Sequence, residues 1–94
     1  MVVGLLSVEL HIGGAHSLKE KRFVLRGLKD RLRGKFNVSI AEVDFQDLWQ
    51  RAGLAVVAVS NARAQVDREL AAVAAEIERL EPGLVSRTEV EFLT

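Results

Sequence analysis

Few side chains in this sequence have the types and spacing that catalysis or metal binding requires. The chain has two histidines, His11 and His16, and no cysteine, which excludes a thiolate metal ligand and a cysteine nucleophile. Glu9 would complete a three-ligand set, but two histidines on different elements are a weak metal signal. As an acid or base, His16 would need a carboxylate partner and a pocket. We therefore expect His16 to be a surface loop residue.

Three carboxylates, Glu42, Asp44 and Asp47, follow the second expected strand. Their spacing is compatible with a cation site made of oxygen ligands. We favour a solvated edge, with Glu42 paired to a cation of the preceding helix. No Ser-His-Asp or Cys-His set is present beyond scattered residues. We predict no catalytic residue, no metal and no cofactor, and hence a protein that is not an enzyme.

The loop from Gly13 and Gly14 to His16 precedes the first expected helix. Free amide N–H groups and the positive end of the helix dipole can bind an anion there, and Lys19 and Lys21 would help. The glycines lack the spacing of a phosphate-binding or dinucleotide-binding motif, and the residues that cap the helix would occupy some of these amides. We favour a turn and keep anion binding as the second interpretation.

Positive charge is concentrated in one segment of a chain whose net charge is zero. Residues 19–35 hold eight Lys or Arg and two acidic residues, a charge of +6, which leaves five basic and eleven acidic residues, −6, elsewhere. At 100° per residue, four of these cations fall on one stripe of a helix: Arg22, Arg26, Lys29 and Arg33. Such a row can follow a phosphate backbone, with salt-sensitive affinity.

Phe23 is expected on the outer side of this helix, where it can stack on a base or anchor a protein partner. Gly27 lies on the same side and leaves room for a bulky partner, at a cost of about 1 kcal/mol relative to alanine. A basic run is more often a solvated helix face than a binding surface. The binding surface that we predict, with solvation as the alternative, consists of Lys19, Arg22, Phe23, Arg26, Lys29 and Arg33.

Apolar periodicity predicts the elements that position these residues. Ser17 and Glu20 form a capping box at the start of the first helix. A change of face near Glu42 indicates a bulge. The expected elements are a strand over 2–12, a helix ending at Gly34, a strand from Phe36, a strand over 54–61, a helix capped by Ser60 or Asn61 and stopped by Pro82–Gly83, and a strand over 84–93.

This order predicts an α+β protein with a ferredoxin-like split βαβ (βαββαβ) fold: a four-stranded antiparallel sheet with two helices on one face. Residues 1–94 form a single domain, because 94 residues support one modest core. No signal peptide or membrane span is apparent, and together with the absence of cysteine this favours a cytoplasmic protein without a membrane partner.

The helix-free face of the sheet is expected to be polar. Its central strands offer Ser7, Glu9, Val57 and Val59 instead of the stacking aromatic residues of an RNA-recognition motif, although the two valines could centre a dimer interface. Trp49, in the connector 46–53, is interpreted as a plug of the core's open end; if exposed, it would indicate an interface. The polar residues expected on the helix-free face are Ser7, Glu9, His11, Asn37, Ser39, Arg87, Glu89 and Glu91.

Two stretches, HSLKEKR (16–22) and KFNVSIAEVDFQDLWQRAGLAVVAVSN (35–61), resemble the YlxP-like family of small bacterial proteins. The likeness runs nearly end to end and is most specific in residues 17–22, 36–39, 41–42 and 47–50. It implies a bacterial cytosolic protein with a ferredoxin-like fold and no established activity, often encoded beside translation-initiation and ribosome-maturation factors. It supplies no catalytic residue.

Two hypotheses follow. The first is an accessory RNA-binding or ribosome-associated protein that uses the basic first helix, with ribosomal RNA or a ribosomal subunit as its partner. The alternative is a homodimeric or otherwise homo-oligomeric interaction module, or a sensor of a small ligand, that acts through its sheet.

Overall fold

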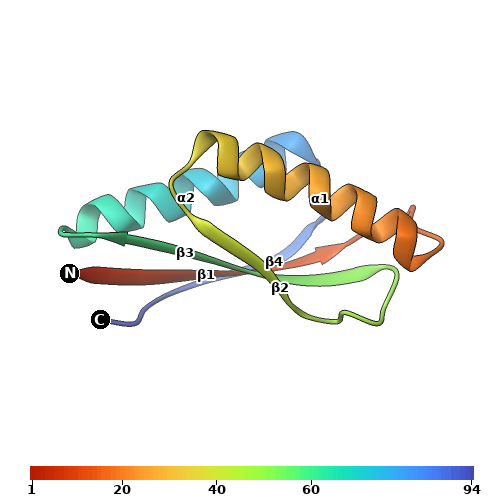
Figure 1. The fold of residues 1–94 in the computed structure, drawn as a ribbon, viewed down its shortest axis with the longest axis horizontal. Coiled ribbons are helices and arrows are strands. Elements are labelled where there is room, and N and C mark those ends of the chain that lie inside the picture. The colour runs from red at the N-terminus through yellow and green to blue at the C-terminus, as the bar shows by residue number, and fades with distance from the viewer.

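The computed structural model describes all residues from Met1 to Thr94. The helices and strands are β1 (Val2–His11), α1 (Leu18–Lys35), β2 (Ser39–Asp44), β3 (Arg51–Ser60), α2 (Arg63–Leu80) and β4 (Val85–Phe92). The strands form one antiparallel sheet in the order β2-β3-β1-β4, and both helices cover the same face of it (Figure 1). The predicted ferredoxin-like βαββαβ fold is confirmed.

The core lies between the sheet and the helices because every second residue of the central strands points towards the helix layer. Leu6, Val8 and Leu10 of β1 are buried there, as are the alternate residues of β3 from Ala52 to Ala58. Gly4 continues this row beneath α2, where a Cβ atom would lie 2.5 Å from Cγ1 of Val66. The glycine therefore allows α2 to pack directly on β1.

The helix α1 begins as predicted and ends slightly later. The Ser17 hydroxyl accepts a hydrogen bond from the N–H of Glu20 at 3.1 Å, and the Glu20 carboxylate accepts one from the N–H of His16. Gly34 does not end the helix, which continues to Lys35. Phe36 ends it, because this residue takes an extended conformation (φ −124°) and packs against the core.

The expected bulge in β2 is confirmed by a register shift between Glu42 and Asp44. Opposite the bulge, a Cβ atom at Gly53 would lie 2.6 Å from Cβ of Asp44, so the close approach of β2 requires a glycine. Phe45 then takes a left-handed conformation (φ 60°), and its ring lies under the Arg51 guanidinium, 3.9 Å from ring centroid to Cζ. β3 starts at Arg51, earlier than predicted, because β1 pairs with β3 as far as His11.

The predicted cap of α2 is wrong. The residue that precedes the helix is Ala62, which has no side-chain hydrogen bond to offer; Ser60 accepts one from the N–H of Ala62 at 3.4 Å instead. At the other end, the helix stops at Leu80 before Gly83, whose φ is 82°. Neither helix is long and apolar enough to cross a membrane.

Candidate functional site

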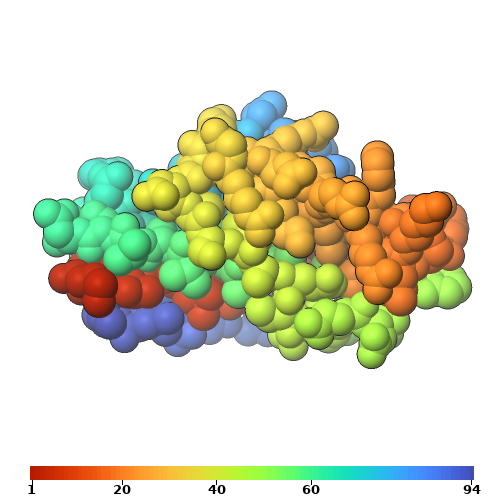
Figure 2. Space-filling view, viewed as in Figure 1, coloured from red at the N-terminus to blue at the C-terminus, as the bar shows by residue number.

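Arg22, Arg26, Lys29 and Arg33, called the basic stripe below, lie along one flank of α1. The adjacent side of the helix buries its leucines against the core, so these four side chains line a shallow groove beside β2, which Glu42 also lines. Figure 2 shows side chains of α1, coloured orange to yellow, standing out from the surface above the sheet. The structure therefore brings the four predicted cations together.

Most α1 cations are not neutralised within the protein. Six of them have no carboxylate oxygen within 4.0 Å: Lys19, Arg22, Arg26, Lys29, Arg31 and Arg33. Arg33 is different, because its Nη2 donates a hydrogen bond to the carbonyl oxygen of Ile40 at 2.8 Å and ties the end of α1 to β2. The cations without a carboxylate partner thus extend along most of the helix, from Lys19 to Arg33.

Lys21 is the exception to the outward-facing charge run. Its side chain is 1% exposed, with Nζ 2.8 Å from Oε2 of Glu42, and Nζ donates a hydrogen bond to the carbonyl oxygen of Phe45 at 2.7 Å. This Glu42 oxygen is buried and has no well-aligned hydrogen bond, so the pair is held by charge and proximity. The predicted pairing of Glu42 with a helix cation is confirmed, whereas the expected help of Lys21 at the Gly13–His16 loop is wrong because Lys21 points into the interior.

Phe23 lies on the outermost side of α1 and is 78% exposed, as predicted. Gly27, one turn later, has no heavy atom within 4 Å of the position that a Cβ would take. A flat aromatic ring next to open space and close to the basic stripe is suited to stacking.

The Gly13–His16 loop is held by hydrogen bonds that build a turn. The N–H of His16 donates to Glu20, and the N–H of Ala15 donates to the carbonyl oxygen of Ile12 at 3.0 Å. Gln50 Nε2 donates to the carbonyl oxygens of Gly13 and Ala15, each at 3.3 Å. Glu20 also places a negative charge at the helix start, which disfavours an anion there. Anion binding by Gly13, Gly14 and His16 stays a prediction.

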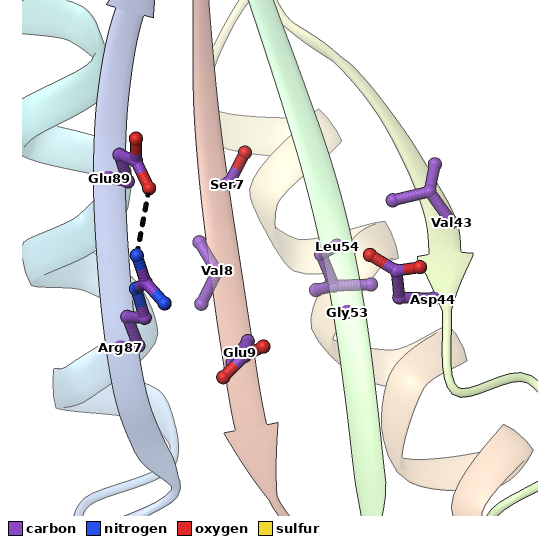
Figure 3. A pocket seen from close by; sticks show the side chains of 9 residues that line it. All are labelled: Ser7, Val8, Glu9, Val43, Asp44, Gly53, Leu54, Arg87 and Glu89. Atoms are coloured by element: carbon purple, nitrogen blue, oxygen red, sulfur yellow. Dashed lines mark hydrogen bonds and ion pairs between the residues drawn. The ribbon is translucent and has the colours of Figure 1, made fainter.

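The helix-free face of the sheet is called the open face below. One half of it is polar and surrounds a hollow (Figure 3). Ser7 and Glu9 reach it from β1, and Arg87 and Glu89 form an ion pair at 3.2 Å along β4. Asp44 closes the side formed by β2, over Gly53. The predicted polar, mixed-charge surface is found in this half.

The other half of the open face is apolar, and sequence reasoning named only Val57 and Val59 from it. The register places Val3 opposite Val59 and Leu5 opposite Val57, and Leu93 donates its N–H to the carbonyl oxygen of Val3 at 2.8 Å. The missed signal was the run of apolar residues at the start of β1, which is apolar on both faces. The apolar half consists of Val3, Leu5, Ala41, Ala55, Val57, Val59 and Leu93.

Two placements from the sequence are wrong. Trp49 does not plug the core but is 51% exposed in the connector beside Leu48, because Ile12 and Ala15 already close that end of the core. Asn37 lies outside the strand that was expected from Phe36: it precedes β2 and lines a hollow together with Gln65 of α2. No group of three or more His, Asp or Glu side chains is arranged to hold a metal ion.

The fold and these surfaces define a small split-βαβ protein with a charged helix flank and a divided sheet face. The chain belongs to the family described as "Protein of unknown function (DUF503)", which matches residues 3–90. It is similar to the "Uncharacterized protein YlxP" of Bacillus subtilis (strain 168), with 44% identity over 94 residues that cover 94% of this chain and 98% of that protein. The resemblance predicted from the sequence is confirmed.

Proposed function

We propose that this protein is a non-enzymatic, cytoplasmic accessory protein that binds RNA through the basic stripe, Lys19 and Phe23. The observation that supports the proposal is the set of six α1 cations with no carboxylate within 4.0 Å. Cations without a carboxylate partner can bind a polyanion, and this binding is favoured because it releases the counterions of the phosphates. Among polyanions, the gene neighbourhood implied by the family resemblance favours ribosomal RNA, free or in a ribosomal subunit.

The arrangement on α1 favours a single-stranded or looped RNA. At 1.5 Å per residue, the basic stripe extends over about 16 Å of helix, which is enough to contact several successive phosphates. Phe23 lies next to the stripe and offers an exposed ring. Bases that are free to stack on an aromatic side chain are found in loops and single strands, not within a duplex.

A titration against ribosomal RNA and isolated ribosomal subunits at two salt concentrations tests the proposal. Arg22→Glu/Arg26→Glu removes two unpaired cations from the stripe. Arg63→Glu/Arg68→Glu is the matched control, because it changes the net charge equally at exposed positions of α2. We expect affinity for the wild type that falls steeply with salt, an unchanged control, and a stripe variant whose log–log salt slope is smaller by about 1.5 to 2.

Two outcomes would contradict this function. If both double variants lose affinity equally, binding reflects overall charge and not the stripe. If the folded wild type does not bind at low salt, the cations only solvate the helix. Circular dichroism of each variant verifies that the fold is retained.

A further inference from the structure

The apolar half of the open face is a contiguous surface that nothing in the chain covers. Both helices lie on the opposite side of the sheet. Val59 and Leu93 are 54% and 53% exposed, and Val3, Leu5 and Val57 are half-buried. Contiguous exposed apolar surface on a small protein marks an interaction site.

We propose that the open face binds a second copy of this chain, with the two-fold axis parallel to the strands and between β1 and β3. This rotation lays β1 of one copy over β3 of the other. Each cross-strand pair of the sheet is then repeated between the copies, so that Val3 faces the twin of Val59 and Leu5 faces the twin of Val57. The apolar halves of the two copies therefore pack against each other, as the inner faces of two packed sheets do.

The polar half of the open face favours a second copy of this chain over a different protein as the binding partner. One row of residues paired across the sheet consists, from β2 to β4, of Asp44, Gly53, Glu9 and Arg87. The same rotation reverses the order of this row in the other copy, so that Arg87 faces Asp44 and Glu9 faces Gly53. An opposite charge thus meets each end of the row.

The two rows on the side of the apolar half contain no like-charge contact. Glu89 lies in the row of Ala41, and Glu91 lies in the row of Ser39, so each glutamate of β4 faces a small residue of β2 in the other copy. A surface that is complementary to itself in shape and charge is the requirement for a two-fold interface.

The size of the face sets the strength of the dimer. Four strands spaced about 4.8 Å apart, with about eight residues of 3.3 Å each, give a flat area of roughly 500 Å² per copy before side-chain relief is counted. Stable complexes bury about 800 Å² per partner. We therefore expect a dimer that dissociates on dilution.

Sedimentation equilibrium over a range of protein concentrations measures this dimer. Val59→Glu places a charge against Val3 of the other copy and is expected to leave a monomer at every concentration. The matched control is Val90→Glu, because Val90 is also an exposed valine (42%) but lies opposite Leu6, on the helix side of the sheet. This control is expected to dimerise like the wild type.

A charge exchange tests the predicted row directly. Asp44→Arg alone brings two arginines together across the interface, and Arg87→Glu alone brings two carboxylates together, so each single variant is expected to dimerise less than the wild type. A mixture of the two variants restores opposite charges at both contacts. We expect mixed dimers at wild-type strength, which a merely structural effect of either substitution would not produce.

Cross-linking tests the orientation, since the chain has no cysteine of its own. Ser7→Cys places a thiol beside the axis, with its Cα about 11 Å from the twin Cα for strands 4.8 Å apart and sheets 10 Å apart. A short bismaleimide should join these thiols and not those of Thr88→Cys, which lies on the helix side opposite Val8. A monomeric wild type, a dimer that survives Val59→Glu, or cross-linking through position 88 overturns the proposal.

All of these variants retain the basic stripe, and the variants that test RNA binding retain the apolar half. A failure of one proposal is therefore distinguishable from a failure of the other.

Discussion

Lys21 and Arg22 are neighbouring cations with opposite environments. Lys21 lies in the core side of α1 against Glu42, whereas Arg22 faces solvent in the basic stripe. Composition alone treats them as equivalent members of a charge run. The 100° turn between successive helix residues separates a residue that positions the loop after β2 from a residue that is free to bind.

Replacing Lys21 tests its structural role. Lys21→Met removes the hydrogen bond to Phe45 and leaves the mostly buried Glu42 carboxylate without its cation. We expect the free energy of unfolding to fall by about 2 to 3 kcal/mol, less than for a fully buried pair because Glu42 retains some contact with water. Urea denaturation measures the loss. Lys19→Met, at an exposed position, should change stability by less than about 0.5 kcal/mol, and equal effects at the two positions would refute the assignment.

Phe23 gives the complementary prediction at an exposed site. Because its side chain is 78% exposed, Phe23→Ala should leave the urea midpoint nearly unchanged. If the ring stacks on a base, the affinity for single-stranded RNA should fall by about 1 to 3 kcal/mol, roughly five- to 150-fold. Unchanged affinity, with binding by the wild type established, would remove Phe23 from the interface and leave the cations alone.

At the scale of elements, α1 and α2 are joined by a cluster of charges at their facing ends. Glu76 of α2 is an ion-pair partner of Arg79 at 2.6 Å and of Lys35, from α1, at 3.2 Å. The hydrogen bond from Arg79, with help from Lys35, lowers the pKa of Glu76 from 4.5 to about 2 although burial opposes the shift. Helical periodicity does not reveal this contact, because Glu76 lies off the apolar stripe of α2 and its partner Lys35 belongs to another helix.

This pKa predicts a pH dependence. A carboxyl group whose pKa is lowered on folding contributes stability above its unfolded pKa, and the contribution is lost as the pH falls through the folded pKa. Glu76→Gln should therefore reduce stability at pH 7, and the difference from the wild type should shrink between about pH 4.5 and pH 2. Denaturation at several pH values measures it, with Asp67→Asn as the control on the exposed side of α2. A difference that does not change with pH would mean that the lost contact is steric.

Period-two and helical patterns in the sequence were sufficient to predict the order of the strands and helices and the bulge after Glu42. The predicted cap of α2 failed because Ser60 and Asn61 are both acceptable caps by type, and only the end of β3 decides that the helix begins beyond them. The predicted burial of Trp49 was wrong for a similar reason, because residue type does not reveal that Ile12 and Ala15 already close the core.

At the scale of the whole molecule, the candidate surfaces were predicted unequally. The basic stripe follows from one helix and its period, so the sequence alone located it. The apolar half of the open face joins residues of four strands, from Val3 to Leu93, and its outline depends on the register between them. No pattern within a single segment contains that register.

The outer strands determine how far self-association can proceed. Backbone groups along β2 and β4 have no strand beyond them and would template growth into a ribbon of unlimited length. β2 offers only six residues and is deformed by its bulge, while β4 bears charged side chains at Arg87, Glu89 and Glu91. Lateral polymerisation is thereby disfavoured, and the association that we propose through the open face closes after two copies.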